Sequence, residues 1–115
     1  MTGDVSAKAI RHAVDADGDA WGWLAARCWA DYPGSVFDRH GELRDLDQVA
    51  SYYTAKGGQT WSAILDDRIV GTLAVAPSEA GGNVWEVSKV YVDPNIRRRS
   101  IATELMAVAE AFVVE

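Results

Sequence analysis

The chain has 115 residues, of which 49% are hydrophobic and 24% are charged, a composition that indicates one soluble globular domain and excludes a disordered chain. Its net charge of −6 excludes broad electrostatic binding to nucleic acids or to anionic membranes, because such binding requires clustered cations. Cys28 is the only cysteine, which excludes an internal disulfide, and we recognise no signal peptide or membrane span. We therefore expect a single domain over residues 1–115, located in the cytoplasm.

The chain is predicted to begin with a strand and a helix. Apolar and polar residues alternate over Lys8–Val14, which predicts the strand, and Ala16–Asp19 supplies turn and N-cap residues. Apolar residues then recur at helical spacing as far as Pro33-Gly34, where the helix is expected to end. Its apolar stripe comprises Trp21, Leu24, Ala25, Cys28 and Trp29.

A second helix is predicted after the polar loop Asp38–Glu42. Asp45 and Gln48 have the spacing of a capping box, and Gly57-Gly58 is expected to end the helix. Its apolar face would consist of Leu46, Val49, Ala50 and Tyr53.

Three strands are predicted in the second half of the chain. Gln59–Leu65 and Arg68–Ala76 are rich in β-branched and aromatic residues, and Asp66-Asp67 between them indicates a tight hairpin turn. The Gly-rich turn Pro77–Asn83 separates this hairpin from Val84–Val92, the third strand. We expect these three strands to be antiparallel neighbours.

A final helix is predicted from Arg98 onward. Its apolar stripe comprises Ile101, Leu105, Val108 and Phe112, with Ala102, Met106, Ala109 and Val113 beside it. The resulting order, β-α-α-β-β-β-α, predicts an α/β protein of the α+β type, in which helices pack on a mixed, mainly antiparallel sheet.

The junction between the last strand and the last helix carries the clearest chemical signal. The strand ends at Asp93-Pro94, a basic turn with Arg97, Arg98 and Arg99 follows, and a helix begins. The first N–H groups of a helix lack intrahelical partners, so a phosphate binds well there, and the arginines add positive charge. Alone, the three arginines would be a solvated basic turn, but in this context they predict a local phosphate site.

This junction resembles the acetyl-CoA-binding motif of the GNAT superfamily of N-acetyltransferases, in which Val-Asp-Pro is followed by Arg-x-x-(small)-x-(Gly or Ala) and an apolar helix. Arg97 corresponds to the leading residue of that motif and Ala102 to its closing Gly or Ala. The strand Glu86–Val92 is similar to the central strand of the family, and the upstream order of elements agrees with it. The motif covers about the last quarter of the chain.

The resemblance implies that acetyl-CoA binds as a co-substrate. The backbone of Val90 and Val92 would pair with the pantetheine arm, and the thioester carbonyl would lie against the backbone near Val90. Backbone N–H groups across Arg98–Thr103 would cradle the pyrophosphate, with Arg97–Arg99 supplying charge. The implied binding residues are Val90, Tyr91, Val92, Arg97, Arg98, Arg99, Ser100, Ile101, Ala102 and Thr103.

The implied reaction is direct transfer of the acetyl group to a primary amine of a small molecule or a peptide, with no metal and no covalent enzyme intermediate. An amine with a pKa of about 10.4 must lose a proton before it attacks, which requires a base. Glu86, on the predicted strand, is the candidate base, and a backbone donor would stabilise the oxyanion.

Two features depart from the family pattern. Ser100 stands where the family has glycine, and its Cβ would crowd the pyrophosphate, whereas its hydroxyl would cap the helix or donate to a phosphate. Family members continue with further strands and helices, which often carry a tyrosine that protonates the leaving thiolate, whereas this sequence ends at Glu115. Two alternatives to an active enzyme therefore remain: a non-catalytic acyl-CoA-binding domain, and a partial domain completed by a partner chain or by homo-oligomerisation through an open sheet edge.

The remaining reactive side chains have simpler interpretations. His12 and His40 have no Cys or His at ligand spacing, so we expect no metal site. Cys28 lies on the apolar stripe of the first helix and is expected to be a core residue. The tryptophans are expected to lie mostly in the core, with Trp29 and Tyr32 as an alternative lining for the acceptor site by family analogy.

Overall fold

The computed structural model describes residues 9–30 and 44–114, without the side chains of Arg44, Asp45 and Arg97–Arg99. The strands are β1 (Ala9–His12), β2 (Gln59–Leu65), β3 (Arg68–Pro77) and β4 (Trp85–Val92), and the α-helices are α1 (Gly18–Trp29), α2 (Val49–Thr54) and α3 (Ile101–Val113). Short 3-10 helices precede each α-helix: η2 (Asp15–Asp17), η3 (Arg44–Gln48) and η4 (Pro94–Arg99). The predicted order of strands and helices is confirmed, while Pro33-Gly34 and Asp38–Glu42 lie outside the described residues.

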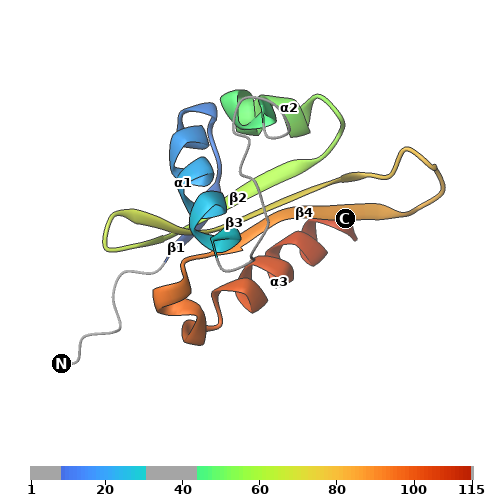
Figure 1. The fold of residues 1–115 in the computed structure, drawn as a ribbon. Helices are drawn as coiled ribbons and strands as arrows, with labels where there is room; N and C mark the ends of the chain where they lie inside the picture. The colour runs from blue at the N-terminus through green and yellow to red at the C-terminus, as the bar shows by residue number, and fades with distance from the viewer. Residues whose placement is uncertain (1–8, 31–43, 115) are drawn as a thin grey trace.

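The four described strands form one antiparallel sheet in the order β1-β2-β3-β4. Helices α1 and α2 cover one side of this sheet and α3 covers the other (Figure 1). The predicted α+β architecture with a mainly antiparallel sheet is therefore confirmed. Within the described residues β4 is an edge strand, and we call the side of β4 that faces away from β3 its outer edge.

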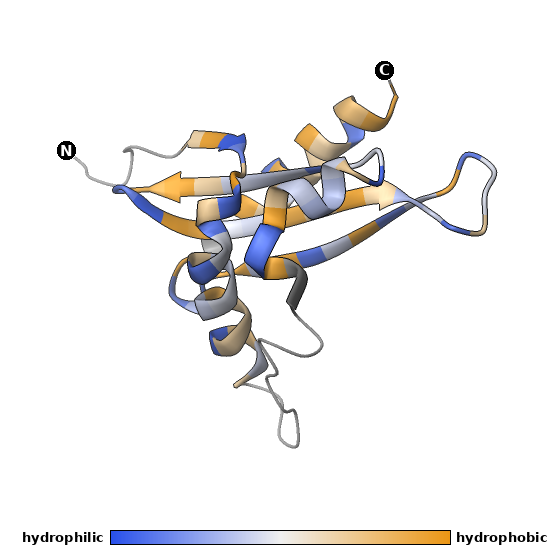
Figure 2. Cartoon of the chain, turned by 90° about the horizontal axis from the view of Figure 1, so that it is seen from above, coloured by the Kyte–Doolittle hydropathy of each residue, from blue (hydrophilic) through white to orange (hydrophobic). Residues whose placement is uncertain are grey.

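The core between the sheet and α3 is built from alternate residues of the strands and one stripe of the helix. Its buried members include Trp61, Leu73, Val75, Val92, Ile101 and Leu105. Figure 2 shows how hydrophobic residues recur along the strands and along α3. Gly71 permits this close packing, because a Cβ at that position would lie 2.7 Å from Ile101 Cγ2 and 3.2 Å from Leu105 Cδ1. None of the described helices is long and apolar enough to cross a bilayer.

The second core lies between the sheet and helices α1 and α2. Its buried members include Ala13, Trp21, Ala25, Leu46, Val49, Tyr53, Ala74 and Ala76. Cys28 is buried, as predicted, and so are Trp21 and Trp61, whereas Trp23 is 50% exposed. Trp29 is half-buried and packs against this core, and Tyr32 lies outside the described residues.

A buried polar network joins β1, α1 and β2. Asp17 accepts hydrogen bonds from Arg11 at 2.7 and 3.1 Å, from the Val14 N–H at 3.1 Å and from the Ser62 hydroxyl at 3.2 Å. The Trp21 indole N–H in turn donates to Ser62 Oγ at 2.9 Å. Burial alone raises the pKa of Asp17, but the hydrogen bonds from Arg11, Val14 and Ser62 outweigh it, so this pKa lies below its ordinary value.

The turns and helix ends show where local sequence patterns were sufficient to predict the structure and where they were not. Asp66 and Asp67 both have positive φ, 53° and 64°, which confirms the tight hairpin turn. The start of α2 was predicted wrongly: the helix begins at Val49, with Gln48 at the N-cap and no side-chain cap there. Asp15 caps it instead, because its Oδ1 accepts from the N–H groups of Ala50 and Ser51, each at 2.8 Å. Helix α3 also begins later than predicted, at Ile101 rather than Arg98.

Candidate functional site

The hydrogen bonds of β4 determine which backbone groups face its outer edge. The Asp93 N–H donates to Val70 O at 2.9 Å, and the Tyr91 N–H donates to Thr72 Oγ1 at 3.3 Å, so both groups face β3. Because backbone groups alternate sides along an antiparallel strand, those of Val90 and Val92 face the outer edge. The thiol of Cys28 on α1 also donates to Val92 O, at 3.4 Å.

A β-bulge interrupts β4 just before Val90. Tyr91 pairs with Thr72 and Ser88 pairs with Ala74, so two residues of β4 oppose one residue of β3. Lys89, in the bulge, has a φ of 55°, in the left-handed region that glycine prefers. The bulge changes which face alternate residues occupy, so that the side chains of Val87 and Val92 both face α3 although they lie five positions apart.

Glu86 lies on the face of β4 that points toward α1 and α2. Its cross-strand partner is Ala76, which packs in the core beneath those helices, and cross-strand partners share a face. The Glu86 side chain is exposed. A strand rises about 3.3 Å per residue, so Glu86 lies at most about 13 Å along β4 from Val90.

Asp93 fixes the turn that leaves β4. Its side chain is only 3% exposed, and its Oδ1 accepts from the Asn95 N–H at 3.0 Å at the start of η4. Arg27 on α1 and Arg68 on β3 each place a guanidinium nitrogen 4.0 Å from its carboxylate. This carboxylate therefore connects the end of β4 to α1, β3 and the turn that precedes α3.

The start of α3 has the conformation expected of a glycine. Ser100 has φ of 60° and ψ of 29°, and its hydroxyl forms no capping hydrogen bond, so the predicted side-chain cap is wrong. Its carbonyl accepts from the Glu104 N–H at 3.1 Å. Ile101 is fully buried, whereas Ala102 and Thr103 are exposed. Arg97, Arg98 and Arg99 lie in η4, and their side chains are outside the described residues.

Replacing Ser100 by glycine is expected to stabilise the fold. A non-glycine residue in the left-handed region costs about 1–2 kcal/mol, and the greater flexibility of glycine in the unfolded chain offsets part of that gain. We expect Ser100→Gly to raise the free energy of unfolding by about 0.5–1 kcal/mol, measured by urea denaturation. Ala102→Gly, in regular helix two residues later, serves as the control and should destabilise. A loss of stability in Ser100→Gly would contradict this account of the turn.

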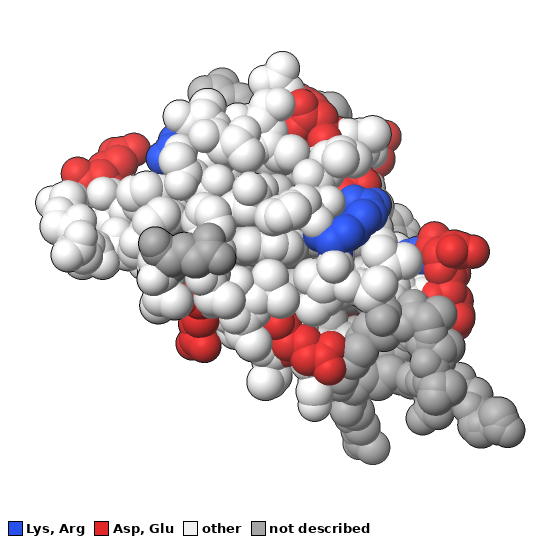
Figure 3. All heavy atoms as spheres, turned by 180° about the vertical axis from the view of Figure 1, so that it is seen from behind, with Lys and Arg blue, Asp and Glu red and all other residues white. Residues whose placement is uncertain are grey.

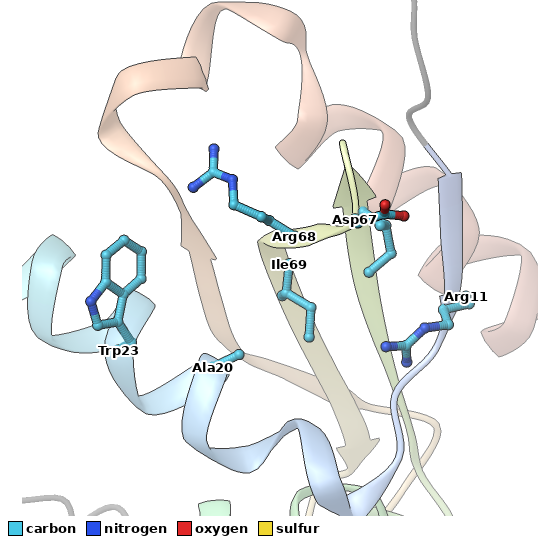
Figure 4. Close-up of a pocket in the computed structure, with 7 residues that line it drawn as sticks. Arg11, Ala20, Trp23, Asp67, Arg68 and Ile69 are labelled. Atoms are coloured by element: carbon cyan, nitrogen blue, oxygen red, sulfur yellow. The ribbon is translucent and has the colours of Figure 1, made fainter.

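A hollow of about 600 Å³ lies elsewhere, between α1 and the β2–β3 turn. Figure 4 shows Trp23 and Arg11 on opposite sides of it, with Ala20 and Ile69 between them. The guanidinium of Arg27 lies 4.8 Å from the centre of the Trp23 ring. None of the binding residues predicted from the sequence lines this hollow, so the hollow and the outer edge of β4 are different features.

Charged side chains of the described residues are sparse on the face of the molecule turned away from the viewer in Figure 1. The face in Figure 3 is mostly uncharged, with acidic side chains around its rim. No group of His, Cys, Asp or Glu in residues 9–30 and 44–114 is arranged to hold a metal ion.

The structure thus places Glu86, Val90 and Val92 on one edge strand and Ser100–Thr103 at the helix that follows it. It shows Tyr91 with its N–H directed to β3 rather than to the outer edge. No local sequence pattern indicates Thr72, or the part that Asp93 plays in holding the turn. A signal for the bulge was present, because the consecutive polar residues Ser88 and Lys89 interrupt the apolar alternation of β4.

Comparisons with known proteins agree with this geometry. A family model described as the acetyltransferase (GNAT) family matches residues 18–115. A GNAT-family acetyltransferase from Staphylococcus aureus Mu50 has a similar structure, with a TM-score of 0.80 at 20% identity over 93% of this chain and 66% of that one. A GNAT-family acetyltransferase from Brucella melitensis in complex with acetyl-CoA gives a TM-score of 0.71 at 18% identity, over 93% of this chain and 68% of that one.

The paia N-acetyltransferase from Thermoplasma acidophilum, in complex with coenzyme A, gives a TM-score of 0.71 at 14% identity, over 94% of this chain and 72% of that one. The chain thus spans about two thirds of the length of these structures. No curated protein gives a significant match to the sequence. The family model matches most of the chain and the fold is the one its structures share, so the chain belongs to the GNAT acetyltransferase family.

Proposed function

We propose that this chain forms the acyl-CoA site of an N-acetyltransferase, which transfers an acetyl group from acetyl-CoA to a primary amine of a small molecule or peptide. The observation that carries the proposal is the bulged outer edge of β4, followed after the short helix η4 by the N-terminus of α3, whose entry residue has a glycine-like conformation. Family membership supports it, as do the similar structures from Brucella melitensis and Thermoplasma acidophilum, which hold acetyl-CoA and coenzyme A.

In this proposal the backbone supplies most of the contacts to the co-substrate. The backbone groups of Val90 and Val92 face the outer edge of β4, where an extended pantetheine arm would pair as a further strand does, with Val92 O also accepting from the Cys28 thiol. The first N–H groups of α3 face a pyrophosphate, and the positive end of the helix dipole favours its charge. Arg97–Arg99 add cationic charge in the same turn.

The chemistry requires one base and one oxyanion donor. Glu86 takes a proton from the amine, directly or through a water molecule, so that the nitrogen can attack the thioester carbon. A C–N bond forms, the C–S bond breaks, and the thiolate of coenzyme A leaves; the second proton that the nitrogen loses as the amide forms passes to this thiolate, directly or through water. The N–H of Val90, held at the outer edge of β4, stabilises the negative charge that develops on the carbonyl oxygen. Residues 1–115 would act as a single, partial domain of this family.

Acetyl-CoA is expected to raise the melting temperature of the purified chain. A ligand at a hundredfold excess over its dissociation constant stabilises the native state by about 2.7 kcal/mol, which for a domain of this size is a rise of about 10 °C. Differential scanning fluorimetry across an acetyl-CoA titration measures the effect. ATP serves as the control, because it carries phosphates and adenine but no pantetheine arm. A cooperative transition that ignores acetyl-CoA, or responds equally to ATP, would refute the proposed site.

A further inference from the structure

One buried side chain holds the bulge of β4. The role that we infer for this side chain in the acyl site rests on the function proposed above. Thr72 on β3 is fully buried, and its hydroxyl donates to Lys89 O at 2.7 Å. The same oxygen accepts from the Tyr91 N–H at 3.3 Å. One hydroxyl thus bonds to the backbone on both sides of Val90. It fills the gap that the extra residue of β4 opens in the ladder between the two strands.

This hydroxyl compensates for a strained conformation. Lys89 has a φ of 55°, which a residue with a side chain adopts at a cost unless the surroundings stabilise it. A hydrogen bond to the Lys89 carbonyl fixes the orientation of the peptide unit that ends in the Val90 nitrogen. The direction of the Val90 N–H therefore depends on Thr72, although Thr72 lies on the neighbouring strand and is itself inaccessible to a ligand.

We propose that Thr72 is a positioning residue of the acyl site, whose hydroxyl holds Lys89 in its left-handed conformation and so directs the Val90 N–H toward the thioester oxygen. Thr72 touches neither substrate. It acts by keeping a backbone donor preorganised, which is what makes such donors effective in acyl transfer. A displacement of that donor by a fraction of an ångström weakens a contact that depends on distance and angle.

Thr60 provides a matched control for this role. It is a buried threonine on the adjacent strand β2, and within the described part of the chain its hydroxyl has no hydrogen-bond partner. Thr72→Val and Thr60→Val exchange the same hydroxyl for a methyl group in the same sheet. Without any ligand, we expect Thr72→Val to speed amide hydrogen exchange at Val90 and Tyr91, and Thr60→Val and Thr72→Ser to leave that exchange near the wild-type rate. Unchanged exchange in Thr72→Val would show that the hydroxyl does not hold the bulge.

The second measurement is the infrared stretch of acetyl-CoA labelled with a heavy carbon isotope at the thioester carbonyl. A hydrogen bond from Val90 should shift this band of the bound ligand to lower frequency. We expect Thr72→Val to lose most of the shift while still binding acetyl-CoA, and Thr72→Ser and Thr60→Val to retain it. The proposal would be overturned if the wild type binds acetyl-CoA without any shift of the carbonyl band. It would also be overturned if Thr72→Val binds acetyl-CoA with the full wild-type shift.

A rescue variant tests the route through Lys89. Glycine adopts the left-handed conformation without strain, so Lys89→Gly in the Thr72→Val background should restore the carbonyl shift. If Thr72→Val alone does not fold, this double variant decides: a wild-type shift supports the proposal, and a folded variant without the shift overturns it. If the wild type binds no acetyl-CoA, the ligand-free exchange data still show whether Thr72 holds the bulge. The proposed function has then failed, and the role of Thr72 in an acyl site fails with it.

Discussion

Glu86→Gln is expected to lower kcat for acetyl transfer by about 10²- to 10⁴-fold, which is the usual contribution of a positioned general base. Glutamine has nearly the same shape but does not accept a proton from the amine. Because Glu86 lies on the face of β4 toward α1 and α2, away from the backbone groups that would hold the pantetheine arm, acetyl-CoA affinity should stay the same. The two effects are separated by measuring turnover, by release of the coenzyme A thiol, and binding, by calorimetry.

The matched control for this variant is Glu79→Gln. Glu79 is an exposed glutamate in the turn between β3 and β4, so the change in charge is the same but lies outside the proposed site. Wild-type turnover in Glu86→Gln would show that Glu86 is not the base. Loss of acetyl-CoA binding in Glu86→Gln would show that it has a structural or binding role. A wild-type chain that binds acetyl-CoA but acetylates no amine would favour the non-catalytic acyl-CoA-binding domain.

Local sequence patterns were sufficient for the elements whose ends are set by neighbouring residues. The turn Asp66-Asp67 was predictable because a two-residue hairpin selects residues that tolerate positive φ. The stripe of α1 was predictable because its spacing alone defines the buried face. The start of α2 was not predictable in this way, because the carboxylate of Asp15 that caps it lies 35 positions earlier in the chain than the first N–H it binds.

The same distinction applies to the candidate site. The Val-Asp-Pro sequence and the basic turn predict a phosphate site at a helix start, and this prediction needs only residues next to one another in sequence. The bulge depends on the register between β3 and β4, and register is set by packing on both sides of the sheet. Ser88 and Lys89 indicate only that the alternation breaks, whereas the partner that holds the break, Thr72, becomes visible once the strands are paired.

Asp17→Asn is expected to lower the free energy of unfolding at neutral pH by about 2 kcal/mol, the scale of hydrogen bonds to a buried charged group. The Asp17 side chain is only 8% exposed, and it holds β1, α1 and β2 together through Arg11, Val14 and Ser62. Asparagine keeps one acceptor oxygen but presents an N–H₂ group to a guanidinium, which also donates. The Arg11 side chain is 45% exposed, so water replaces part of what it loses, and the effect stays well below that of a fully buried pair.

The difference in free energy of unfolding between the wild type and Asp17→Asn is expected to depend on pH, and the direction of this dependence follows from the pKa of Asp17. The pKa of Asp17 is lower in the folded protein than in the unfolded chain, because hydrogen bonds from Arg11, Val14 and Ser62 outweigh the opposing effect of burial. The stability it provides is therefore present above the unfolded pKa of about 3.9 and is lost as the pH falls through the folded pKa. Urea denaturation of the wild type and Asp17→Asn should show a gap at pH 7 that narrows in acid.

Asp19→Asn tests whether the stability lost in Asp17→Asn comes from removing a negative charge near the start of α1 or from breaking the hydrogen-bond network of Asp17. Asp19 is exposed in the first turn of α1, so its replacement removes the same charge near the same helix N-terminus. It should lower stability by only a few tenths of a kcal/mol, as expected for a carboxylate near a helix dipole at the surface. Equal losses in the two variants would assign the effect to the dipole of α1. If the difference in stability between the wild type and Asp17→Asn stays constant down to acid pH, the ionisation of Asp17 does not contribute to it. Packing around the side chain would then account for the stability lost in Asp17→Asn.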